Sequence, residues 1–286
     1  MDLKQAAISI CMIAFVLSSM LAMGLGLRVS DIVAPLRNWR LVILALLANF
    51  VVMPFAALTL ARTLRLEESM GIGLLLLGMA AGAPFLPTLA QMARGNLAFA
   101  VGLMVLLMVI TVGYVPVVLP LLLPGVSVNP AQIARSLVLL MLLPLGSALA
   151  VKANRPGLAA TIKPFFDKTS NLSLIALMAL QTLLNVRSVV AVFGTGGILA
   201  GVLFLAVGFI VGWALGGAAR ETRSVLGLGT AQRNIAAALV VANQSFDDPN
   251  VVVMVVVIAI VGLVTLMPLS RALGRRVAAA TAAPVR

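Results

Sequence analysis

Nine apolar stretches, each about as long as a membrane-spanning helix, limit what this chain can fold into. An α-helix needs roughly 20 apolar residues to cross the hydrocarbon core of a bilayer. Hydrophobic residues make up 62% of the 286 residues, and a soluble fold of this length cannot bury so much apolar surface. The sequence therefore predicts an all-α integral membrane protein with nine transmembrane helices. The predicted spans are 8–27, 41–60, 70–90, 97–119, 133–151, 172–186, 190–215, 225–243 and 251–269.

The connections between these spans are predicted to be short. The longest is expected around residues 152–168, which leaves no room for a separate soluble domain. We therefore expect a single transmembrane domain over residues 1–286. The first apolar stretch exceeds the roughly 7–15 residues of a signal-peptide core, which favours a true first span.

The residue types that are missing exclude several classes of function. The chain has no histidine and one cysteine, Cys11, so we expect no histidine-based metal or haem site and no intrachain disulfide. No buried nucleophile–base pair is apparent either, which argues against an enzyme. The net charge of +12 is typical of a membrane protein with a basic cytoplasmic face. We therefore expect the lipid bilayer as a partner, and not nucleic acid.

The distribution of basic residues predicts the orientation in the membrane. With nine spans, fourteen lysines and arginines fall on one side and five on the other, and Arg233 lies inside a span. Basic residues accumulate on the cytoplasmic side of membrane proteins. We therefore expect a multi-pass protein of the cytoplasmic (inner) membrane, with its N-terminus outside and its C-terminus in the cytoplasm.

The third and eighth predicted spans are poor continuous helices. Prolines interrupt the middle of the third, and proline removes a backbone N–H that a helix needs. A polar run interrupts the eighth. A simple proline kink and a polar cluster packed against a neighbour are the alternatives. Interrupted segments at corresponding positions of two halves are typical of inverted-repeat transporters and mark their binding sites. The residues predicted at the helix breaks are Gly82, Pro84, Pro87 and Gly229.

Arg233 lies in the polar run of the eighth span. An arginine at a helix centre costs about 2.5–3.5 kcal/mol on insertion scales, and all eight acidic residues map to termini or loops. Arg233 must therefore meet water, backbone carbonyls or an anionic ligand, unless it reaches the membrane interface. We predict contact with a small organic anion; a structural cap on the opposite broken helix, near Gly82 and Ala83, is the alternative.

Other polar side chains of the spans complete the predicted binding site. Asn49 could bind substrate or could form a helix–helix hydrogen bond. Asn171, Gln181 and Asn185 share one helical face, which could line a wet cavity or form a polar seam. The candidate substrate-binding residues are Arg233, Gln232, Asn234, Thr230, Asn49, Thr88, Gln91 and Asn185.

Four short motifs resemble those of the bile acid:sodium symporter family. LAMGLGLRVSDI at 21–32 is similar to its Met-Gly-Leu-x-Leu-x-x-x-Asp stretch, and ANFVVMP at 48–54 to its Ala-Gln-Phe-x-x-Met-Pro. MARGN at 92–96 and AQRNIAAAL at 231–239 resemble sequences beside its two crossover helices. The resemblance implies a panel and a core of helices, with two unwound helices that cross at the midplane. It matches the nine-helix members of that family.

The sodium ligands that this resemblance implies are missing. Only Asn49 stands at a ligand position with a comparable oxygen, and sodium is a hard cation that needs several. We therefore expect no metal site, no cofactor and no sodium coupling. The other ligand positions hold Leu86, Pro87, Ala100, Met104 and, depending on the alignment, Gly227 or Leu228.

These observations predict a secondary transporter that moves a small organic anion by alternating access. A passive anion channel, with Arg233 in its pore, is the alternative reading of the same residues.

Overall fold

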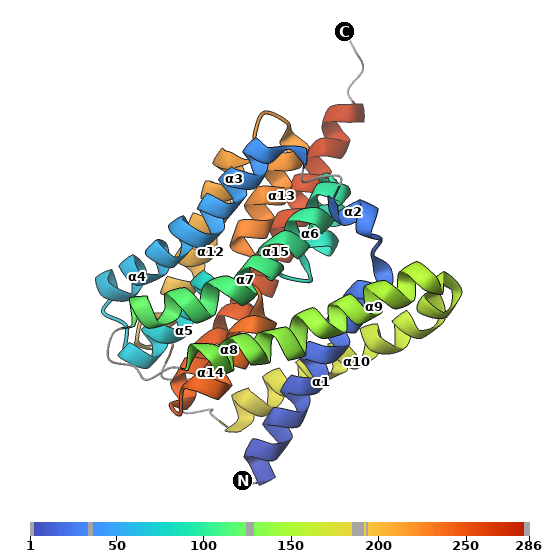
Figure 1. Cartoon of the computed structure of the whole chain (residues 1–286). Coiled ribbons are helices and arrows are strands. Elements are labelled where there is room, and N and C mark those ends of the chain that lie inside the picture. The colour runs from blue at the N-terminus through green and yellow to red at the C-terminus, as the bar shows by residue number, and fades with distance from the viewer. Residues whose placement is uncertain (1–2, 34–36, 124–128, 185–191, 193, 283–286) are drawn as a thin grey trace.

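The computed structural model describes residues 3–33, 37–123, 129–184, 192 and 194–282, and all regular structure in these ranges is helical (Figure 1). The all-α prediction is confirmed for them. The N-terminal elements are α1 (Leu3–Gly26), α2 (Val29–Val33), α3 (Trp39–Leu47), η2 (Ala48–Val52), α4 (Met53–Thr63), α5 (Glu68–Met79), α6 (Leu86–Met92) and α7 (Leu97–Leu122). The remaining ones are α8 (Pro130–Leu137), η3 (Val138–Leu142), α9 (Leu143–Asn154), α10 (Pro156–Leu184), α12 (Gly197–Leu215), α13 (Arg220–Ala231), α14 (Ile235–Ser245) and α15 (Pro249–Ala282).

Seven helical runs in the described residues are long and apolar enough to cross a membrane. The predicted third span is divided between α5 and α6. The predicted sixth, 172–186, belongs to α10 as far as Leu184, and its last two residues lie outside the described ranges. The total of nine spans stays a prediction. The seven runs are Ala6–Gly26, Trp39–Thr63, Leu97–Leu122, Pro130–Asn154, Gly197–Leu215, Arg220–Ser245 and Pro249–Ala278.

Helix α10 corrects the prediction that the longest connection between spans lies around residues 152–168. The helix begins at Pro156 and continues to Leu184, so most of that connection is helical. Proline suits a first helical turn, where its missing N–H has no partner to lose. About two turns further on, Lys163 Nζ lies 2.6 Å from Asp167 Oδ2 across an i,i+4 pair. The sequence analysis missed this part of the helix because it identified helices by apolar stretches, and this part contains charged residues.

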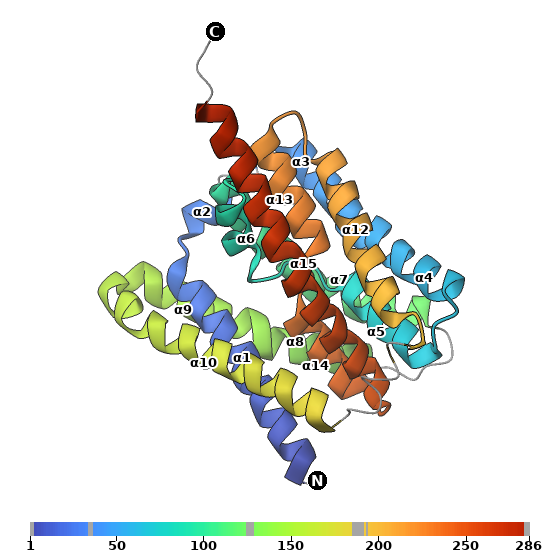
Figure 2. The same ribbon diagram turned by 180° about the vertical axis from the view of Figure 1, so that it is seen from behind.

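The helices form two groups (Figures 1 and 2). The first, which we name the panel, contains α1, the run α8–η3–α9, and α10. Its helices approach closely: a Cβ atom on Gly24 of α1 would lie 2.6 Å from Ala148 Cβ of α9. The second group, which we name the core, contains α3–η2–α4, α5, α6, α7 and α12 to α15.

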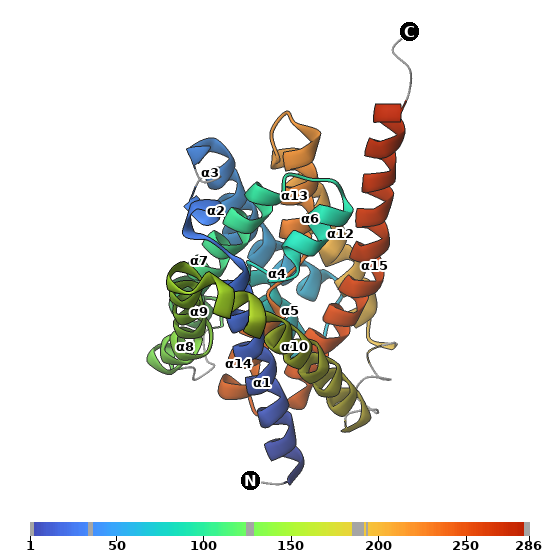
Figure 3. The ribbon, with the colours of Figure 1, turned by 90° about the vertical axis from the view of Figure 1, so that its right-hand side faces the viewer.

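The run α13–α14 forms the centre of the core. In the most apolar 18-residue stretch of Arg220–Ser245, 94% of the residues are buried. The corresponding share for Pro130–Asn154 of the panel is 28%. Other helices therefore surround α13–α14 on nearly all sides. The two divided runs point in opposite directions: α5 and α14 lie toward one end of the molecule, and α6 and α13 toward the other (Figures 1 and 3).

Candidate functional site

Both predicted interruptions are present, and they touch. Helix α5 ends at Met79 and α6 begins at Leu86, while α13 ends at Ala231 and α14 begins at Ile235. The backbone N–H of Asn234, in the second break, donates to the carbonyl of Ala80, in the first, over 2.9 Å. The two gaps therefore meet at one point inside the core, which we name the crossing.

The glycine and prolines predicted at the breaks occupy three different environments. Gly82 has φ +81°, and a Cβ atom there would lie 2.3 Å from the backbone N of Met108 in α7. Glycine alone fits both constraints. Pro84 lies in the break, whereas Pro87 lies in the first turn of α6, where proline is tolerated.

Gly229 lies outside the break. It is helical, inside α13 and two residues before the end of that helix. A Cβ atom there would lie 2.9 Å from Leu86 Cδ2, so this glycine provides space for α6 to pack closely. The polar run after it, and not the glycine, ends the helix.

The polar groups released by the first break have side-chain partners. Thr111 of α7 accepts from the Ala81 N–H over 3.0 Å and donates to the Ala81 carbonyl over 3.1 Å. Asn234 Nδ2 donates to the Gly82 carbonyl over 3.1 Å, and Asn234 Oδ1 caps α14 at the N–H of Ala237. Unpaired backbone groups are very costly in a membrane interior. These side chains therefore stabilise the unwound segments.

Arg233 holds the end of α5. Its Nε donates to the Leu77 carbonyl over 2.8 Å and its Nη2 to the Gly78 carbonyl over 2.7 Å. Its side chain is buried, with 3% of the residue exposed. The carbonyls at a helix C-terminus carry partial negative charge, and in the described residues Arg233 has no carboxylate partner. The guanidinium is therefore a buried positive charge balanced by backbone carbonyls.

Asn49 extends this network to the second predicted span. Its Oδ1 accepts from Arg233 Nη1 over 2.7 Å, and its Nδ2 donates to Thr230 Oγ1 over 3.2 Å. Asn49 lies in the π-helical turn η2, and such turns are frequent at functional sites. The hydroxyl of Tyr114 donates to the Phe50 carbonyl of the same turn over 2.6 Å. Five of the predicted residues, Arg233, Gln232, Asn234, Thr230 and Asn49, are thus gathered at the crossing.

Gln232 differs from its neighbours. Its side chain has no hydrogen-bond partner in the described part of the chain, although 94% of the residue is shielded from solvent. An amide offers both donors and an acceptor. Gln232 is therefore the polar side chain at the crossing that remains available to a ligand.

The other predicted residues lie apart from the crossing. Thr88 and Gln91 are exposed on α6, and Asn185 lies outside the described residues. On α10, Asn171 is exposed and Gln181 is buried, so the polar face of this helix has no uniform environment.

Sequence reasoning missed Thr111 and Tyr114. They are three residues apart in α7, so they share one face of that helix. Both are polar residues within an otherwise apolar span, and Tyr114 is the one tyrosine of the chain. That pattern was the signal that could have identified them.

The described residues contain no cluster of three or more histidine, cysteine or acidic side chains. Three of the positions at which the family resemblance implies sodium ligands are apolar and tightly buried: Leu86, Ala100 and Met104 are each at most 1% exposed. Gly82 packs directly against the Met104 carbonyl, since a Cβ atom on Gly82 would lie 2.6 Å from that oxygen. These side chains provide packing and no ligand oxygens.

Comparison with known proteins identifies the family. The model of the sodium bile acid symporter family matches residues 12–192, more than half of the chain. The chain belongs to this family. Its members are transporters, so the chain is a multi-pass membrane transporter and not an enzyme, as predicted.

Proteins of a plant and of a bacterium are similar to this chain. The chain is 24% identical over 269 residues to the probable sodium/metabolite cotransporter BASS5, chloroplastic, of Oryza sativa, covering 88% of this chain and 67% of the rice protein. It is 29% identical over 138 residues to the uncharacterized sodium-dependent transporter YocS of Bacillus subtilis, covering 46% of this chain and 42% of that protein.

Proposed function

We propose that this transporter moves a small organic anion by alternating access, without coupling to sodium. The observation on which the proposal rests is the position of Arg233. This buried cation lies in the break between α13 and α14, and its guanidinium binds the end of α5 in the other interrupted span. The names of the similar proteins associate those proteins with sodium, so this chain would depart from them in its coupling.

The arrangement of the helices supports an inverted repeat. A continuous span, an interrupted span and a long helix follow one another twice, as α3–α4, α5–α6 and α7, and as α12, α13–α14 and α15. The two interrupted runs point in opposite directions (Figure 1). In transporters of this kind, one group of helices moves against the other around a central site. We propose that the panel and the core move relative to each other around the crossing.

The contacts of Arg233 support sodium independence. The Leu77 and Gly78 carbonyls and Asn49 Oδ1 are oxygen acceptors of the kind that bind a hard cation. All three accept hydrogen bonds of 2.7–2.8 Å from the guanidinium. A cation that is part of the side chain therefore occupies the acceptors that a free ion would need.

The same residues support an anionic substrate. The positive charge of Arg233 lies next to the N-terminus of α14, which begins at Ile235, and a helix N-terminus also favours negative charge. Gln232, beside Arg233, provides an amide without a partner in the described residues. We propose that the anion binds at Gln232 and is attracted by Arg233.

A binding and uptake experiment tests this proposal. Purified protein would be screened by thermal shift against carboxylates and sulfonates, such as pyruvate, succinate and taurocholate, in sodium and in choline buffers. We expect the same affinity for a stabilising anion in both, with saturable uptake and trans-stimulation in liposomes. A tenfold or larger loss of affinity in choline would contradict sodium independence. Non-saturating conductance would favour the passive channel.

Variants at the crossing test the residues. Gln232→Ala should fold, because its side chain has no partner in the described chain, and should weaken anion binding. Arg233→Lys keeps the charge but loses the planar fork, so it should weaken binding, and Arg233→Gln should weaken it further. The exposed Arg62→Gln is the matched control. Normal anion affinity in all the crossing variants would refute the assignment.

A further inference from the structure

A slot between α12, α13 and α15 lies outside the proposed transport site. Its volume is about 420 Å³, and its walls are mainly apolar. Phe209 and Ile210 line it from α12, and Leu269 and Leu273 from α15. Ile210 is 64% exposed on a helix that is long and apolar enough to span the membrane. This wall of the slot therefore faces the lipid hydrocarbon.

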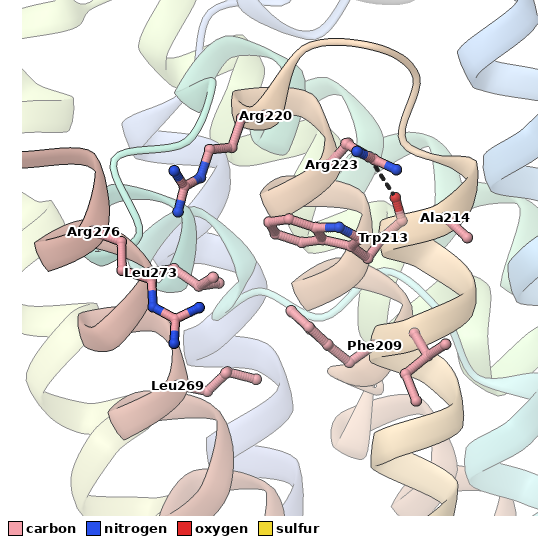
Figure 4. A pocket seen from close by; sticks show the side chains of 9 residues that line it. Phe209, Trp213, Ala214, Arg220, Arg223, Leu269, Leu273 and Arg276 are labelled. Carbon is pink, nitrogen blue, oxygen red and sulfur yellow. Dashed lines mark hydrogen bonds between the residues drawn. The ribbon is translucent and has the colours of Figure 1, made fainter. Parts of the chain in front are cut away.

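Three arginines line the same slot: Arg220 and Arg223 from α13 and Arg276 from α15. Arg223 is fixed: its Nε donates to the Trp213 carbonyl over 3.2 Å, and its guanidinium lies 5.7 Å from the centre of the Trp213 ring. Arg220 and Arg276 are exposed. Their guanidinium groups lie on the same side of the slot (Figure 4), and no carboxylate pairs with either in the described chain.

Arg220 and the apolar wall of the slot lie at different depths, whereas the guanidinium of Arg276 extends to the level of Phe209 (Figure 4). Arg220 begins α13, directly after the short connection from α12, so it lies where the chain turns at the end of the bundle. On α15, Leu269 precedes Arg276 by about two helical turns and lies further from that end. The Trp213 ring lies across the slot from these arginines, at a level between the guanidinium groups of Arg220 and Arg276 (Figure 4), and tryptophan is enriched at the boundary between headgroups and hydrocarbon.

We propose that this slot binds an anionic phospholipid. Its phosphate would lie between Arg220 and Arg276, and its acyl chains would lie against Phe209, Ile210 and Leu269. A ligand for this slot must combine negative charge with an apolar body, because the basic end continues directly into a wall that faces lipid. Basic pockets between transmembrane helices on the cytoplasmic side commonly bind such headgroups, and this end of the chain is the predicted cytoplasmic side.

Native mass spectrometry of the detergent-purified protein tests the proposal. Dioleoyl phosphatidylglycerol and dioleoyl phosphatidylcholine would be titrated separately. We expect preferential binding of phosphatidylglycerol, and about a 30-fold loss of this affinity in the double variant Arg220→Gln/Arg276→Gln. The control, Arg62→Gln/Arg135→Gln, removes two exposed arginines elsewhere and should keep the affinity. Phosphatidylcholine binding should be the same in all three proteins, which reports intact folding.

Three results would overturn the proposal. One is equal binding of both lipids to the unmodified protein. Another is an equal loss of phosphatidylglycerol binding in the control and the slot variant, which would show a response to net charge only. The third is displacement of the bound lipid by millimolar glycerol 3-phosphate, which would indicate a site for a soluble anion.

Discussion

Replacing Thr111 by valine tests how the first break is stabilised. The hydroxyl of Thr111 accepts from the Ala81 N–H and donates to the Ala81 carbonyl, over 3.0 and 3.1 Å. Thr111 is 0% exposed. Valine has nearly the same shape, so Thr111→Val removes both hydrogen bonds without opening a cavity.

The cost follows from what remains at Ala81. Its N–H loses its partner, and among the described residues its carbonyl keeps one long contact, of 3.4 Å from Asn234 Nδ2. A buried backbone group without a partner costs about 1–3 kcal/mol. We therefore expect Thr111→Val to lower the free energy of unfolding by about 2–4 kcal/mol. At roughly 2–4 °C per kcal/mol for a chain of this size, the melting temperature should fall by about 5–15 °C.

Thermal unfolding in one detergent, followed by circular dichroism at a helical wavelength, measures this effect. Thr59→Val is the matched control, because its exposed hydroxyl bonds only to the Phe55 carbonyl of the preceding turn, and its cost should stay within about 0.5 kcal/mol. Thr111→Ser keeps the hydroxyl and should retain most of the stability. Equal melting temperatures for Thr111→Val and Thr59→Val would refute the reasoning.

Three further predictions address the glycine, the arginine and the topology. Gly82→Ala should reduce folded yield, because the left-handed backbone alone costs about 1–2 kcal/mol for a residue with a Cβ atom, while Gly113→Ala, in open space on α7, should be neutral or stabilising in the same expression and unfolding assays. Arg233→Ala should unfold at a lower temperature and regain stability with millimolar ethylguanidinium; recovery with tetramethylammonium, which has no N–H donors, would contradict the role of the hydrogen bonds. Single cysteines at the two ends of a cysteine-free chain should react with impermeant reagents from opposite sides, and labelling from the same side would remove one predicted span.

The interruptions could be predicted because they have a chemical cause in the sequence. Proline lacks the N–H that a helix requires, and a polar run is expensive in a membrane unless its groups have partners. These two facts predicted the interruptions of the third and eighth spans. The exact positions depended on packing: Pro87 begins α6 and Gly229 remains inside α13.

The partners of Arg233 could not be predicted in the same way. The carbonyls of Leu77 and Gly78 lie more than 150 positions away in the sequence, and a carbonyl is common to every residue type. The sequence suggested the neighbourhood of Gly82 and Ala83 as an alternative cap, whereas the observed contacts lie about one helical turn earlier. The register in which two interrupted helices cross is a property of the assembled core.

A cation that is part of the chain has a different energetic role from a cation that diffuses. A sodium ion couples transport to its gradient because it enters from one side and leaves on the other. Arg233 can balance the carbonyls of α5 and attract an anion, but it remains with the protein and carries no gradient energy. Unless another ion is coupled, a transporter that uses such a fixed charge moves its substrate down the gradient of that substrate, or exchanges it for another anion. The proposed loss of sodium coupling therefore implies facilitated diffusion, exchange or coupling to an ion other than sodium, with the interrupted helices held together independently of the sodium concentration.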